Sequence, residues 1–147
     1  MKHEYPDFDK INQQKYDNNV PDHNTNCGNC TSSTADLLLH GKVNPAGPSK
    51  PQTLTDVEGR TDFGGKFQPV GDYGKLHQDM LSSPPGTHAS IAVKWPGESV
   101  GHFFNAHRAP DGTVRYLDGQ SGLPADMSRP PSEIWTMKYP LPGAAVP

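Results

Sequence analysis

Alternation of hydrophobic and polar residues predicts an antiparallel sheet in the second half of the chain. Residues 88–95, HASIAVKW, place an apolar side chain at every second position, as in a strand with one buried face. The segments 101–108 and 113–118 flank the turn-forming sequence APDG, which predicts a β-hairpin. A last strand is predicted over Ile134 to Tyr139, ahead of a proline-rich end.

Start and stop residues, and in one case helical spacing of apolar residues, predict two helices. The first runs from Cys27 to His40, with the N-cap residues 24–26 before it and Gly41 as its stop. The second runs from a capping Asp72 to Ser82 and carries an apolar stripe at helical spacing. Between them, the segment 54–57 begins a short element that the glycines at 64–65 interrupt. A helix packed against an antiparallel sheet gives an α+β fold.

Length and composition agree with one compact, loop-rich domain. The chain has 147 residues, of which 32% are hydrophobic, and its 15 glycines and 16 prolines favour few long elements. We expect residues 1–23, which are polar, to form an extended lead-in or linker, and residues 24–147 to form the single domain. The net charge of -3 gives no basic footprint for nucleic acid, and no apolar run predicts a membrane span or a signal peptide.

The hairpin places an imidazole beside a carboxylate. If its turn centres on Pro110, His102 faces Asp118 and Phe104 faces Tyr116 on one surface of the sheet, whereas a slip of one residue breaks this alignment. A carboxylate in that position orients the ring and stabilises the imidazolium, as in a nucleophile, base and orienter site. A surface histidine near a turn aspartate is the alternative interpretation.

Cys27 is the candidate nucleophile. At the start of a helix, the free N–H groups and the macrodipole favour the thiolate over the thiol. Small side chains at positions 31–35 allow this helix to lie close to the sheet, within reach of His102.

The pair Cys27 and Cys30 permits other interpretations. A disulfide within one helical turn has poor geometry, although a redox CxxC pair at a helix start stays open. A zinc site requires two more ligands, which His102 and His107 are able to supply. The signature of zinc nucleobase deaminases is missing, since the chain has no His-x-Glu and no proline before Cys27.

Three motifs together resemble a known family. NCGNC followed by a helix ending in glycine, then GHFFNA, then YLDGQSG, is similar to the papain-fold toxin domain of glutamine deamidase type, found at the C-termini of bacterial polymorphic toxins. The resemblance extends from about Asn26 to Gly122. It implies a papain-like fold, in which an N-terminal catalytic helix packs on an antiparallel sheet.

The resemblance also implies a role for each site residue. Cys27 is then the nucleophile, His102 the general base and acid, and Asp118 the orienter. Gln120, Asn24 and Asn26 are then candidates for binding the oxyanion or the substrate. Papain-type proteases read CGxCW with the second cysteine catalytic, which makes Cys30 the alternative nucleophile, although this chain has threonine in place of the tryptophan.

The function implied is hydrolysis of a glutamine side chain in a target protein to glutamate and ammonia, without metal or cofactor. A protease or a transglutaminase uses the same three residues, and a non-catalytic binding module or a metal-binding CxxC domain is the alternative of another class. A toxin of this type is secreted or injected, acts in the cytoplasm of a target cell, and has a cognate immunity protein. No nucleic acid or membrane partner is expected.

Overall fold

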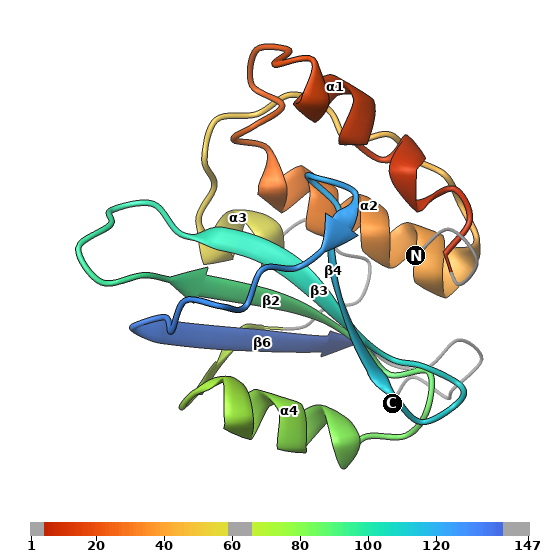
Figure 1. Cartoon of the computed structure of the whole chain (residues 1–147), viewed down its shortest axis with the longest axis vertical. Helices are drawn as coiled ribbons and strands as arrows, with labels where there is room; N and C mark the ends of the chain where they lie inside the picture. Colours follow the sequence, from red (N-terminus) through yellow and green to blue (C-terminus); the bar gives the residue numbers. More distant parts are fainter. Residues whose placement is uncertain (1–4, 59–65, 140–147) are drawn as a thin grey trace.

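The computed structural model describes residues 5–58 and 66–139, and shows helices on both sides of an antiparallel sheet (Figure 1). Among these residues the strand order is β1-β6-β2-β3-β4-β5. The strands are β1 (Gln68–Val70), β2 (His88–Lys94), β3 (His102–Arg108), β4 (Val114–Asp118), β5 (Leu123–Pro124) and β6 (Glu133–Tyr139). The helices are η1 (Phe8–Lys10), α1 (Gln13–Asp17), α2 (Cys27–His40), α3 (Leu54–Glu58) and α4 (Tyr73–Leu81). The predicted α+β class is confirmed.

Helix α2 has the predicted bounds. It begins at Cys27 and ends before Gly41, whose φ of 67° is the left-handed conformation that stops a helix. The side chain of Asn26, at the N-cap position, makes no capping hydrogen bond, contrary to expectation. It is turned instead into the protein, where it donates to Asn12 Oδ1 and to the carbonyl oxygen of Gly47. The Asn26 side chain therefore does not cap the backbone N–H groups in the first turn of α2.

Helix α4 confirms the second predicted helix. Asp72 caps it by accepting a hydrogen bond from the backbone N–H of Lys75, at 2.8 Å. Leu76 and Met80 are fully buried, and Tyr73 packs at the edge of the same cluster. The short element predicted at 54–57 is helix α3, and the predicted break at residues 64–65 lies outside the described residues.

The β3–β4 hairpin has a register that differs by two residues from the predicted one. Ala106 pairs with Tyr116 and Arg108 with Val114. The cause is the turn, in which Gly112 takes a φ of 92° and donates to the carbonyl oxygen of Ala109, adding a residue to the loop. A shift of two preserves the side-chain alternation, so His102 and Asp118 remain on one face as diagonal neighbours.

Two layers of core side chains lie on the two faces of the sheet. The face toward α2 buries Ala92, Phe103 and Met137, together with Leu39 of the helix. On the opposite face, Leu76 and Met80 of α4 pack against the other set of alternating strand residues (Ala89, Ile91, Val93, Phe104, Ala106 and Ile134). Strand β2 is therefore covered on both sides, which explains its nearly continuous burial.

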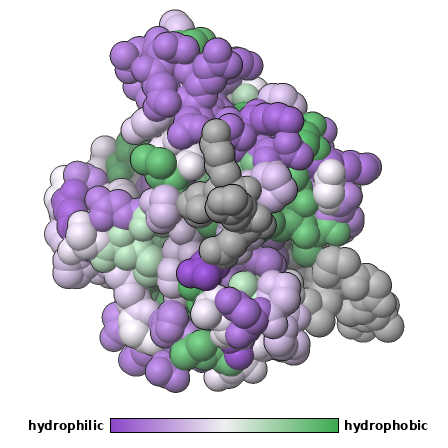
Figure 2. Space-filling model, turned by 45° about the vertical axis from the view of Figure 1, so that its right-hand side comes forward, coloured by the Kyte–Doolittle hydropathy of each residue, from purple (hydrophilic) through white to green (hydrophobic). Residues whose placement is uncertain are grey.

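The N-terminal segment is packed rather than extended, which corrects the expected lead-in conformation. Residues 8–17 form η1 and α1, and Tyr5, Phe8 and Ile11 are buried in a cluster with Cys30 and Leu117. Helix α1 has no buried residue of its own, and Figure 2 shows hydrophilic side chains over this end of the molecule. Although this segment is polar in composition, three of its side chains (Tyr5, Phe8 and Ile11) are buried in the core. No helix in the described part of the chain is both long and apolar enough to cross a bilayer.

Candidate active site

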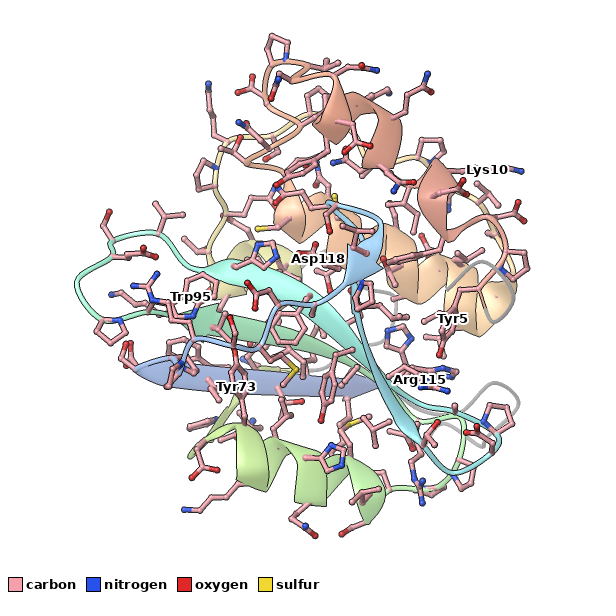
Figure 3. The ribbon with its side chains drawn as sticks, in the orientation of Figure 1. Tyr5, Lys10, Tyr73, Trp95, Arg115 and Asp118 are labelled. Carbon is pink, nitrogen blue, oxygen red and sulfur yellow. The ribbon has the colours of Figure 1, made fainter. Side chains whose placement is uncertain are left out.

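Cys27, His102 and Asp118 come together at the start of α2. His102 is the first residue of β3 and Asp118 the last residue of β4, and their side chains meet with 2.8 Å between Nε2 and Oδ2. Cys27, the first residue of α2, is close enough to the same imidazole to influence its pKa. Figure 3 shows Asp118 at the end of β4 opposite to the end that carries Arg115. The structure thus brings the three predicted residues to one corner of the fold, with a direct contact between His102 and Asp118.

His102 is poised to carry a positive charge. Burial of the ring acts to lower its pKa, but the hydrogen bonds to Asp118 and Cys27 and the charges of both groups outweigh burial and raise the pKa to about 10. An imidazolium at this position places a positive charge beside Cys27.

Cys30 occupies a different environment from Cys27. It is fully buried, and its thiol donates to Asn26 Oδ1 at 3.5 Å. Burial, followed by the nearby Cys27 and Asp118, raises the pKa of this thiol. A thiol that resists ionisation is a poor nucleophile, so these observations favour Cys27.

Gln120 contacts the site through both its backbone and its side chain. Its backbone N–H donates to Asp118 Oδ1 at 3.0 Å, which holds the carboxylate while Oδ2 meets His102. Its side-chain Nε2 lies 3.4 Å from Asn26 Oδ1, next to the start of α2. Asn26 is fully buried and Asn24 is exposed. Of the three predicted binding residues, Gln120 is the one that contacts the His102 and Asp118 pair.

A buried polar network around Asn12 supports the start of α2 and the loop after Asp118, and no local pattern in the sequence indicated it. Asn12 donates to the carbonyl oxygens of His23 and Gln120, at 2.9 and 3.0 Å. Its Oδ1 accepts from Asn26 and lies 2.7 Å from His23 Nδ1. Burial and the neighbouring Lys15 lower the pKa of His23, which keeps that ring neutral. Residues from the N-terminal segment thus fix both the residue before Cys27 and the loop after Asp118.

Trp95 stacks on His102, with ring centroids 6.4 Å apart and planes 21° from parallel. Its indole N–H donates to the carbonyl oxygen of Arg129, and the Arg129 guanidinium lies 5.5 Å above the indole ring. Arg129 is itself held by an ion pair to Glu98. Trp95 directly precedes Pro96 and Gly97, and the fold brings its ring against the imidazole.

The two residues proposed as additional zinc ligands do not share a site. His107 lies at the far end of β3, where its Nδ1 is 2.9 Å from Tyr5 Oη. Burial lowers its pKa. Within residues 5–58 and 66–139, no group of three or more His, Cys, Asp or Glu side chains is arranged to hold a metal ion.

Two cavities meet at Gly101 and His102. The larger, about 480 Å³, contains the polar groups of the site, namely Asp118, Gln120, Asp126 and Arg129, with Tyr16 and Trp95 at its walls. The smaller, about 320 Å³, lies on the α3 side and has mostly apolar walls. The imidazole is therefore accessible from two directions.

Comparison with known families agrees with this geometry. The chain matches the family model described as papain fold toxin 1, glutamine deamidase over residues 25–123, about two-thirds of its length. The matched span contains Cys27, His102, Asp118 and Gln120. No curated protein sequence matches the chain. The chain belongs to the papain fold toxin 1, glutamine deamidase family.

Proposed function

We propose that this protein is a cysteine-dependent protein-glutamine deamidase in which Cys27, His102 and Asp118 are the catalytic residues. The observation that carries the proposal is the 2.8 Å contact between His102 and Asp118 near Cys27, the first residue of helix α2. Family membership supports the choice of a glutamine side chain as the substrate.

The first half of the reaction forms a thioester. The Cys27 thiolate attacks the carboxamide carbon of the target glutamine, and the carbonyl oxygen takes the negative charge of the tetrahedral intermediate. His102 then donates its proton to the amide nitrogen, which leaves as ammonia when the carbon–nitrogen bond breaks. Asp118 keeps the ring oriented and stabilises its charged form throughout.

The second half restores the enzyme. His102, now neutral, takes a proton from water, and the resulting hydroxide attacks the thioester carbon. The carbon–sulfur bond breaks, the thiolate returns to Cys27, and the product is a glutamate side chain. We propose the backbone N–H groups at the start of α2, which the Asn26 side chain does not cap, and the Gln120 side chain as donors to the oxyanion.

The biological role we propose follows from the family. A toxin domain that changes a neutral amide into a carboxylate alters the charge and the hydrogen-bond donors of its target. We propose that the protein is a secreted effector that acts in the cytoplasm of a target cell on a protein carrying a reactive glutamine. A cognate immunity protein that covers the cleft is the second partner we propose.

The test uses two matched cysteine variants. Wild type, Cys27→Ala and Cys30→Ala are incubated with candidate cytosolic proteins, and released ammonia and peptide masses are measured. We expect a gain of about one dalton at a single glutamine with wild type and Cys30→Ala, and none with Cys27→Ala. Cleaved peptides instead identify a protease, and glutamine cross-linked to amines identifies a transglutaminase. Full activity in Cys27→Ala refutes the assignment of the nucleophile.

A further inference from the structure

The smaller cavity beside His102 has no assigned role in the reaction above. Its volume is about 320 Å³, and it is formed by α3, the strands β2, β3 and β6, and the loop between β2 and β3. Most of its walls are apolar (Leu54, Ala92, Val93, Val100, Phe103 and Trp135). Apolar walls of this extent favour an apolar occupant, because the apolar surface of both is then removed from water.

This cavity is continuous with the proposed catalytic site. Its lining includes His102 but not Cys27, and it shares Val100, Gly101 and His102 with the cavity that holds Asp118 and Gln120. Cys27 lines neither cavity, and a group that fills the apolar one lies beside His102 without entering the cavity that holds Asp118.

Val100 marks the junction of the two cavities. Its side chain is 51% exposed, which is unusual for a large apolar residue. Tyr16, another exposed apolar side chain, lies at the wall of the polar cavity. Apolar surface thus surrounds the entrance to the site, where a bound protein segment would cover it.

We propose that this cavity binds a large apolar side chain of the target protein, carried by a residue adjacent to the glutamine that is modified. The inference rests on the proposed function and specifies its substrate: a glutamine flanked by a residue such as leucine or phenylalanine. Burial of that side chain contributes to transition-state binding only when the neighbouring glutamine is in position.

Beside the apolar residues, the walls carry the polar side chains of Gln52, Thr53, Lys94 and Ser99 and the His102 imidazole. Gln52 donates from Nε2 to Ser49 Oγ at 2.9 Å, and Ser49 spends its own proton on the carbonyl oxygen of Lys50. The amide nitrogen of Gln52 is therefore engaged, whereas its buried Oε1 has no hydrogen-bond partner in the described part of the chain.

The first experiment compares short peptides with one central glutamine flanked by leucine, alanine or aspartate. The variants are Val100→Asp and, as a matched control, Val43→Asp, since Val43 is also an exposed valine (37%) and lines neither cavity. We expect wild type and Val43→Asp to release ammonia from the leucine peptide with a kcat/KM roughly 10- to 100-fold above that of the alanine peptide. We expect Val100→Asp to lose most of this preference.

A second measurement does not depend on deamidation. The same peptides, with the glutamine carboxamide replaced by a chloromethyl ketone, alkylate a thiolate by forming a carbon–sulfur bond and releasing chloride. We expect faster labelling of Cys27 by the leucine probe than by the alanine probe, and loss of this difference in Val100→Asp. Ammonia release or labelling without preference for the leucine flank overturns the inference and leaves the proposed function standing. Selective labelling without ammonia release from any peptide supports the inference and overturns the proposed function.

Discussion

At the scale of single residues, His102 is held between a carboxylate and a thiol, and its protonation depends on both. Its pKa of about 10 in the folded protein lies above the ordinary value of 6.5. The folded state therefore binds this proton more tightly than the unfolded state. The resulting stabilisation is complete below pH 6.5 and is lost as the pH rises through about 10.

Asp118→Asn tests this dependence. Without the carboxylate, burial dominates, and we expect the pKa of His102 to fall, measured by NMR titration of the ring protons. The alkaline limb of kcat/KM should move from near pH 10 to lower pH, and kcat should drop roughly 10²-fold. The stability advantage of wild type should be largest below pH 6.5 and should shrink as the pH rises toward about 10. An unchanged His102 titration contradicts the role of Asp118; Asp111→Asn, in the exposed hairpin turn, is the control.

Gly28, which follows Cys27, shows how closely the site is packed. A Cβ at this position would overlap Gln52 Oε1 and lie 3.2 Å from Val57 Cγ2. We expect Gly28→Ala to lower the free energy of unfolding by about 1–3 kcal/mol and to impair Cys27. The double variant Gly28→Ala/Gln52→Ala should lose less stability than the sum of the two single changes, measured by urea unfolding. Strict additivity excludes this contact as the cause.

At the scale of elements, helix α2 has different requirements at its two ends. The N-terminal end presents the thiol and its free N–H groups, whereas the C-terminal end needs only a residue that tolerates the left-handed conformation of Gly41. We expect Gly41→Ala to cost about 1 kcal/mol in thermal or urea unfolding and to leave deamidation unchanged. Gly47→Ala, where an added Cβ meets nothing closer than 4.0 Å, serves as the control. If Gly41→Ala stays folded but loses activity, the C-terminal end of α2 affects catalysis as well as stability.

Local patterns in the sequence were sufficient for the elements that position the site. The N-cap residues 24–26 and the stop at Gly41 predicted α2, and alternation predicted β2. The hairpin register was wrong by two residues, because the extra residue at Gly112 depends on turn geometry; the shared face of His102 and Asp118 survived, since two is the side-chain period of a strand. Strands β1 and β5 are short and take their conformation from their neighbours, so their own residues gave no signal.

At the scale of the whole molecule, the N-terminal segment ties the site to the rest of the fold. Tyr5, Phe8 and Ile11 bury their side chains beside Cys30 and Leu117, whereas Asn12 bonds to the residues around the site. Single apolar residues spaced along a polar segment look like a linker in the sequence. Their burial depends on surfaces contributed by α2 and β4, which are distant in sequence, and no local pattern records such contacts.

Ile11→Ala separates a linker from a packed part of the domain. Ile11 is 1% exposed, so removing its side chain leaves a cavity against α2 and should lower the free energy of unfolding by about 2–5 kcal/mol in urea. Lys15→Ala, on exposed α1 in the same segment, should change it by less than about 0.5 kcal/mol. Asn12 follows Ile11 directly and hydrogen bonds to both Asn26 and the Gln120 carbonyl. We therefore also expect Ile11→Ala to reduce kcat under conditions in which the variant is still folded. Equal stability of the two variants means that this segment is a linker after all, and that the network around Asn12 is dispensable for the position of Cys27.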